Sequence, residues 1–192
     1  MSRREVAFLS GQYYHIYNRG ANREAIFRSA ENYRFLLRRV KEQASLRKIT
    51  IVAYCLMPNH YHFLLRQETD EPVSSFVQAV FNSYTKAYNK MYGRTGTLFE
   101  ERFKAIEVDK FEYLILLCRY IHYNPVGAGL AKHPAEWQFS NYREWVGQRE
   151  GSLVDLEFVK ENFPQHDEYE QFVLNYVQPE KLSRGFQELL LG

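Results

Sequence analysis

Two apolar runs joined by a two-residue turn constrain the fold of this chain more than any other feature. Residues 49–56 are apolar and rich in β-branched side chains, and residues 60–66 form a second run of apolar and aromatic residues. Such residues favour strands, and the Pro58-Asn59 pair between the runs is typical of a tight turn. The sequence therefore predicts a β-hairpin here.

Helical patterns flank this hairpin on both sides. Amphipathic helices are predicted over residues 31–46 and 72–91, because apolar side chains recur there at helical spacing. Residues 13–18 and 103–108 are predicted as a first and a fourth strand. The order β-α-β-β-α-β predicts an α+β, ferredoxin-like fold, in which an antiparallel sheet carries both helices on one face. That topology would place residues 60–66 in the middle of the sheet.

Two histidines of the predicted third strand face the same way. His60 and His62 flank Tyr61, and alternate side chains of a strand share one face. The two imidazoles would lie about 7 Å apart along the strand, close enough to converge on one metal ion. A His-X-His pair is a weak motif by itself, and two ordinary polar residues on a half-exposed strand explain it equally well.

A second motif, on a predicted helix over residues 111–124, strengthens the functional interpretation. Pro125 disfavours the helical conformation at Asn124, so we expect the helix to end there. Tyr120 and Asn124 are four residues apart and therefore neighbours on the helix surface. They lie at the rim of an apolar stripe, well placed to face a site on the sheet. The stripe consists of Phe111, Leu114, Ile115, Cys118 and Ile121.

Together the two motifs suggest a metal-assisted reaction at a phosphodiester. Two neutral imidazoles, His60 and His62, and the amide oxygen of Asn124 would leave open positions on a divalent cation, which suits Mg²⁺ or Mn²⁺. The cation would polarise and orient the phosphodiester. Tyr120 would be the nucleophile that forms a covalent bond to phosphorus. Its phenol, with an ordinary pKa near ~10, needs a base or a cationic environment to react at neutral pH.

These motifs resemble those of the HUH endonuclease superfamily, specifically its single-tyrosine (IS200-like) transposases, and most of all the REP-associated tyrosine transposases. The resemblance extends over residues 12–146. One position departs from the pattern: the family usually has an arginine after Asn-Pro-Val, where this chain has Gly127, so the phosphate contact of that arginine is not carried over. The segments that carry the resemblance are residues 14–20, 57–65, 96–104, 119–130 and 137–142.

The resemblance implies a DNA transposase or endonuclease with His60, His62 and Asn124 as metal ligands and Tyr120 as nucleophile. It implies cleavage and rejoining of single-stranded or hairpin DNA through a 5′-phosphotyrosine with a free 3′-OH, and a hairpin-forming repeat element as substrate. Three alternatives stay open. They are a DNA-binding regulator with a vestigial site, a replication-initiator-type nickase or relaxase of the same superfamily, and a metallohydrolase that would not need Tyr120.

The distribution of charge supports a polyanionic partner better than the net charge of +2 does. Residues 1–150 hold 22 Lys and Arg against 15 Asp and Glu, and residues 151–192 hold 3 against 8. A basic body with an acidic tail is consistent with nucleic-acid binding, although an ordinary solvated surface has the same composition. The cations predicted to contact DNA are Arg19, Arg23, Arg94, Arg102 and Lys104.

Three residues close to these motifs have competing interpretations. His15, on the predicted first strand, is either a partner that contacts a metal-binding residue without touching the metal or a histidine that only satisfies its own hydrogen bonds within the sheet. Tyr123 is the main rival nucleophile, but its position on the helix turns it away from the side that carries Tyr120. His122 lies on the apolar side of that helix and is predicted to be structural.

The last part of the chain is predicted to differ from the body. We expect a nuclease domain over residues 1–150 and an acidic helical extension over residues 151–192, which either packs back on the body or covers the DNA-binding face. Prolines separate the predicted helices of this extension. These helices cover residues 155–163, 168–177 and 181–191.

The cellular setting is inferred from cysteines and hydropathy. Cys55 and Cys118 fall inside apolar runs without disulfide spacing, which predicts free thiols in a reducing compartment. No apolar stretch approaches the ~20 residues that span a bilayer, and no hydrophobic signal core follows the N-terminus. We therefore expect a cytoplasmic monomer or homodimer with no membrane partner.

Overall fold

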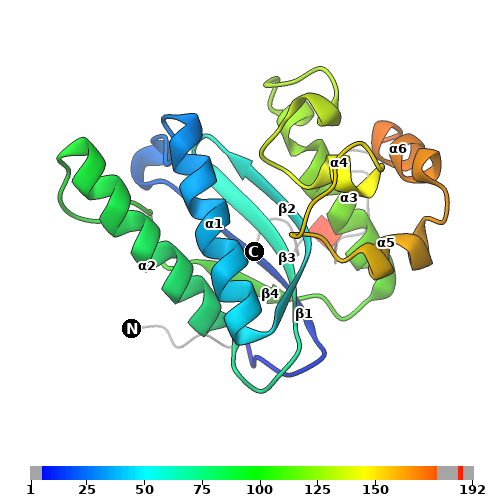
Figure 1. Ribbon diagram of the computed structural model, residues 1–192, viewed down its shortest axis with the longest axis horizontal. Coiled ribbons are helices and arrows are strands. Elements are labelled where there is room, and N and C mark those ends of the chain that lie inside the picture. The colour runs from blue at the N-terminus through cyan, green and yellow to red at the C-terminus, as the bar shows by residue number, and fades with distance from the viewer. Residues whose placement is uncertain (1–5, 177–185, 188–192) are drawn as a thin grey trace.

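A four-stranded antiparallel sheet forms the centre of the computed structural model, which describes residues 6–176, 186 and 187 (Figure 1). The strand order is β2-β3-β1-β4, so the first and third strands are central. This arrangement confirms the predicted ferredoxin-like α+β fold. The strands are β1 (Tyr13–Arg19), β2 (Ile49–Met57), β3 (His60–Gln67) and β4 (Lys104–Glu107).

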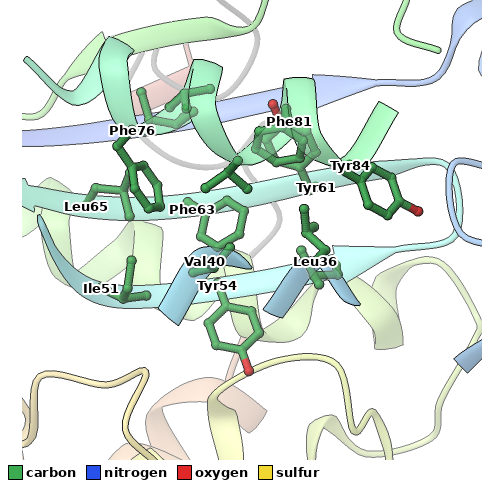
Figure 2. Packing of buried hydrophobic residues seen from close by; sticks show 14 of the residues in the cluster. Leu36, Val40, Ile51, Tyr54, Tyr61, Phe63, Leu65, Phe76, Phe81 and Tyr84 are labelled. Carbon is green, nitrogen blue, oxygen red and sulfur yellow. The ribbon is translucent and has the colours of Figure 1, made fainter. Parts of the chain in front are cut away.

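Helices α1 (Ala30–Arg47) and α2 (Val73–Tyr92) cover one face of the sheet (Figure 1). Figure 2 shows how side chains of β3 meet these helices: Phe63 lies among Tyr61, Phe81 and the aliphatic side chains of α1. The rings of Tyr61 and Phe81 stack at a centroid distance of 4.1 Å. Burial of each such aromatic side chain contributes about 1.5–3 kcal/mol, so this first core holds much of the folding free energy.

The opposite face of the sheet is covered by α3 (Phe111–Gly127). It packs against β2 and β3, and Leu114, Cys118 and Ile121 of its predicted apolar stripe form a second core with side chains from later helices. Phe111 of that stripe is 59% exposed. Cys55 and Cys118 belong to this core and are free thiols, as predicted. The other helices on this side are α4 (Tyr142–Trp145), α5 (Leu156–Asn162) and α6 (His166–Leu174), and two short 3-10 turns, η1 (Ala21–Arg23) and η2 (Pro134–Glu136), complete the elements.

The prediction that the tyrosine-bearing helix ends at Asn124 was wrong. Helix α3 continues through Pro125 to Gly127. The proline removes one N–H from the last turn, but the N–H groups of Ala128 and Leu130 still donate to the carbonyls of Asn124 and Pro125. These bonds keep the last turn helical despite the proline. Asn124 is therefore inside the helix, one full turn after Tyr120.

The described part of the C-terminal extension packs back on the body rather than standing apart. Helix α6 contacts α3, and Phe158 of α5 and Tyr169 of α6 are buried in the second core. The third predicted helix, over residues 181–191, lies outside the described residues except for Phe186 and Gln187, and the predicted domain boundary at residue 150 stays a prediction. No helix in the described ranges has the length and apolar content needed to cross a membrane.

Candidate active site

The β2–β3 hairpin presents both histidines of the His-X-His motif to α3. In the antiparallel register His60 lies opposite Arg19 and His62 opposite Tyr17. Tyr61 between them points into the first core, so the alternation of the strand sends both imidazoles to the other face. Their ring centroids are 5.2 Å apart. His62 is buried, with 6% of its surface exposed, and His60 is half-buried.

Helix α3 brings Tyr120 and Asn124 to the same place. Oδ1 of Asn124 lies 3.1 Å from Nε2 of His60. The ring of Tyr120 packs edge-on against His62, with the centroids 5.5 Å apart and the ring planes at 84°. The four residues selected from the sequence thus converge on one spot, and their chemical roles stay predictions.

Burial sets the protonation state of this cluster. Burial is the main cause that lowers the pKa of His60, and it lowers the pKa of His62 well below the ordinary histidine value. Both rings are therefore neutral at pH 7, the form that can bind a metal. Burial also raises the pKa of Tyr120, whereas a hydrogen bond with Asn124 lowers it. Because Oδ1 of Asn124 lies toward Nε2 of His60, its NH2 group is the part that can donate to the phenol, and a donated bond favours the phenolate.

The proton on His60 is placed by Asn59. The Nδ2 group of Asn59 donates to the carbonyl of Arg23 at 3.2 Å, and Oδ1 of Asn59 lies 2.7 Å from Nδ1 of His60. An amide oxygen only accepts, so Nδ1 carries the proton of the neutral ring. Nε2 therefore offers a lone pair toward Oδ1 of Asn124, and two acceptors face each other across 3.1 Å.

This pair of facing acceptors fits a divalent cation. Neighbouring ligands of an octahedral ion with bonds of about 2.1 Å are about 3 Å apart, close to the observed separation. The amide oxygen is an ordinary ligand for Mg²⁺ or Mn²⁺, which would take water and phosphate oxygens at their open positions, and neutral imidazole is the commonest side-chain metal ligand. Among the described residues no group of three or more His, Cys, Asp or Glu side chains is arranged to hold a metal. A site here would accordingly need the amide of Asn124 as its third ligand beside His60 and His62.

Comparison with known proteins identifies the family. Residues 8–124, more than half of the chain, match the family model described as "Transposase IS200 like". The chain belongs to the IS200-like transposases. A search of curated proteins gave no match for this transposase.

Solved structures support the fold of the transposase. A REP-associated tyrosine transposase bound to a REP hairpin is 21% identical, with a TM-score of 0.65 over 81% of this chain and 94% of that one. A putative transposase from Deinococcus radiodurans is 18% identical, with a TM-score of 0.43 over 61% and 92%. The tRNA(His) guanylyltransferase of Saccharomyces cerevisiae is 12% identical, with a TM-score of 0.45 over 99% and 80%. Only the first similarity is strong enough to compare folds.

Carboxylates accompany three of the five cations predicted to bind DNA. Arg19 forms an ion pair with Glu100, Arg94 lies 3.8 Å from a carboxylate oxygen of Glu24, and Lys104 lies 3.5 Å from one of Glu101. Arg23 and Arg102 are exposed. Because Arg19 pairs in register with His60, it lies beside the candidate cluster in the sheet.

The loop that carries Arg102 runs beside β1. Gly20, next to Arg19, forms an isolated bridge with Phe99, and Lys104 of β4 pairs with Tyr17 of β1. The predicted cations therefore gather along the β1–β4 side of the sheet, with Arg94 further away beside the ring of Tyr88. Their contact with DNA stays a prediction.

Two residues beside the cluster, His15 and Asn59, contact its histidines in ways that the sequence did not predict. His15 was left between two interpretations, and its Nε2 lies 3.0 Å from Nδ1 of His62. Asn59 was interpreted only as part of a turn, although it directly precedes the His-X-His motif. This position next to His60 was the sequence signal that could have identified Asn59. His122 is buried between Tyr169 and Asn141 and hydrogen-bonds both, which agrees with its predicted structural role.

Proposed function

We propose that this transposase cleaves and rejoins single-stranded or hairpin DNA through a covalent 5′-phosphotyrosine on Tyr120. A divalent cation, Mg²⁺ or Mn²⁺, would be held by His60, His62 and Asn124. The observation that carries the proposal is the convergence of a phenol, two neutral imidazoles and an amide oxygen from a central strand and one helix. A regulator without nuclease activity would not need this arrangement.

The reaction is a transesterification that balances without a further reactant. The phenolic oxygen of Tyr120 attacks phosphorus, the bond between phosphorus and the 3′ oxygen breaks, and the phenol proton ends on that 3′ oxygen. The 5′-phosphotyrosine keeps the energy of the broken phosphodiester, so a 3′-OH can reverse the step and join strands. When bound, the cation supplies Lewis acidity at the phosphate oxygens.

Residues of this chain prepare Tyr120 for the attack. Burial raises the pKa of its phenol, which keeps the nucleophile protonated at neutral pH and limits its reactivity. The NH2 group of Asn124 counteracts this by stabilising the phenolate. Packing of the Tyr120 ring against His62 fixes its direction, and a fixed orientation lowers the entropic part of the barrier.

The choice of a hairpin as substrate is supported by family and fold. The matched family consists of transposases, and the relative with the same fold was solved bound to a REP hairpin. On this chain two exposed cations flank the β1–β4 pair: Arg23 ends the η1 turn after β1, and Arg102 lies in the loop before β4. Such cations supply most of the affinity for a phosphate backbone.

Adduct formation tests the proposal directly. The full chain is incubated with end-labelled hairpins that carry single-stranded flanks, with Mn²⁺ or Mg²⁺, and separated on a denaturing gel. We expect a protein–DNA adduct that requires the cation and disappears in Tyr120→Phe, with hairpin binding retained.

Tyr123→Phe is the matched control, because Tyr123 lies on the same helix and is also half-buried. Its ring is stacked on Tyr176 at 4.1 Å, so this variant should form the adduct as the wild type does. An adduct that persists in Tyr120→Phe and disappears in Tyr123→Phe would transfer the role of nucleophile. Binding without an adduct in the wild type would favour the regulator, and turnover of small phosphodiesters by Tyr120→Phe would favour a metallohydrolase.

A further inference from the structure

The two histidines of the site differ in what their second nitrogen contacts. His62 is buried, and its Nδ1 lies 3.0 Å from Nε2 of His15. His15 has none of its surface exposed. The two rings are nearly parallel, with centroids 5.2 Å apart, and Tyr17 stacks on His15 from the same strand. This packing gives the contact between the two imidazoles one fixed geometry.

In a hydrogen bond between two neutral imidazoles either ring can be the donor, and the two directions have different consequences for His62. If Nε2 of His15 donates, His62 carries its own proton on Nε2 and has no lone pair there for a cation. If Nδ1 of His62 donates, its Nε2 is free. Each neutral ring holds one proton, so the polarity of this single contact decides whether His62 is able to bind a metal.

His60 already shows which pattern the site uses. Oδ1 of Asn59, oriented by the carbonyl of Arg23, accepts the proton of Nδ1 of His60 and leaves Nε2 as an acceptor directed at Asn124. His15 occupies the corresponding position beside His62. Metal-binding histidines generally donate their other N–H to such a partner, which fixes both tautomer and ring orientation.

We propose that His15 and Asn59 are positioning residues that accept the Nδ1 protons of His62 and His60, so that both Nε2 lone pairs are directed at one cation. The inference rests on the proposed cation site and extends it to two residues that would not touch the cation. His15 must then hold its own proton on Nδ1. It reaches His62 from the neighbouring central strand, whereas Asn59 reaches His60 from the turn.

The tautomers are measurable in the metal-free wild-type protein. In ¹⁵N-labelled protein at pH 7.5, two-bond nitrogen–proton correlation spectra distinguish Nδ1–H from Nε2–H rings. We expect His60 and His62 as Nδ1–H tautomers, with assignments from single His→Gln variants. An Nε2–H tautomer at His62 would overturn the role of His15, and one at His60 would overturn that of Asn59.

Matched variants then test the consequence for the cation, with Mn²⁺ affinity measured by calorimetry. His15→Gln keeps an acceptor oxygen near the position of Nε2, whereas His15→Leu removes it. We expect His15→Leu to bind Mn²⁺ about 10–100-fold more weakly, the usual effect of losing such a partner, and His15→Gln to stay within a few-fold of the wild type. At His60, Asn59→Leu removes the acceptor in the same way and should also weaken Mn²⁺ binding.

The two experiments separate this inference from the proposed function. Equal losses in His15→Gln and His15→Leu, or no loss in either, would overturn the positioning role while the cation site stands. A wild-type protein that binds no Mn²⁺ would overturn the cation site, and the inference with it. Adduct formation that depends on Mn²⁺, together with an Nε2–H tautomer at His62, would leave the proposed function intact and overturn the inference alone.

Discussion

The two faces of the sheet carry different kinds of side chains. Toward α1 and α2, strand β3 directs Tyr61, Phe63 and Leu65 into a continuous apolar core. Toward α3, the same strand directs His60 and His62, and β1 adds His15. The second face still buries apolar residues around α3, but its central part is a cluster of polar rings.

This difference shows how one strand supplies both stability and chemistry. Since the side chains alternate, neighbouring residues of β3 belong to different faces, and a one-residue shift in register would exchange them. The dense packing of the first face opposes such a shift. We therefore expect substitutions on the first face to affect mainly stability and those in the polar cluster of the second face to affect mainly activity.

The largest effect is expected from Phe63→Ala on the first face. Phe63 is almost fully buried, and removal of a buried phenylalanine ring costs about 3–5 kcal/mol. Urea denaturation would measure the loss in the free energy of unfolding. Phe63→Leu, which fills most of the same space, should lose much less. A loss below about 1 kcal/mol in Phe63→Ala would contradict the view that this face holds the stability.

A slightly smaller effect is expected from acid, through His122 on the second face. Burial lowers the pKa of His122 to about 4, against about 6.5 in the unfolded chain. As pH falls from 6.5 to 4, the unfolded state binds a proton that the folded state does not, so stability decreases by about 3 kcal/mol. Above pH 6.5 His122 adds no pH dependence to the free energy of unfolding.

Denaturation curves at several pH values would measure this effect as the difference between the wild type and His122→Gln. Contributions from other titrating groups are common to both proteins and cancel in the difference. Identical pH profiles of the two proteins would show that His122 does not titrate in this way.

The next effect is catalytic. His60→Ala removes one proposed ligand at a half-buried position, so we expect the rate of adduct formation to fall at least about a hundredfold, or a little under 3 kcal/mol in the barrier, with little change in stability. Single-turnover assays with Mn²⁺ and thermal denaturation would measure the two quantities. A variant that loses its fold instead would show that His60 contributes mainly to stability, which would contradict the expected difference between the two faces.

The smallest effect is expected at an exposed cation. If Arg19 contacts a phosphate, Arg19→Gln should reduce the slope of log hairpin affinity against log salt concentration by about one. Arg38→Gln is the control, because Arg38 is also exposed and ion-paired, with Glu31, but lies on α1. Equal changes in the two variants, measured by fluorescence anisotropy at several salt concentrations, would contradict a DNA contact specific to Arg19.

The fold could be predicted from the sequence because each element carries its own local pattern. The alternation of β1 and the apolar runs of β2 and β3 place the strands, and the spacing of apolar residues places α1 and α2. The end of α3 could not be placed in this way. The residue before a proline is only biased away from the helical conformation, and hydrogen bonds beyond Pro125 extend this helix to Gly127.

The candidate site was predictable where its geometry is local. Residues two apart on a strand share a face, and so do residues four apart on a helix. These spacings grouped His60 with His62 and Tyr120 with Asn124. The partnership of His15 with His62 depends on strand register across β1 and β3 and on the direction of each ring nitrogen, which no local pattern contains. The same holds for the ion pair of Arg19 and Glu100, which depends on the path of a loop.

The strand order has a consequence for synthesis on the ribosome. Strand β1 emerges first, pairs with β3 on one edge, and stays unpaired on its other edge until the four residues of β4 appear. Helix α2 and the loop after it must be translated in the interval, which takes a few seconds at about 5–20 residues per second. During that time the nascent protein has an open strand edge, the kind of surface that promotes aggregation, and the short last strand closes it.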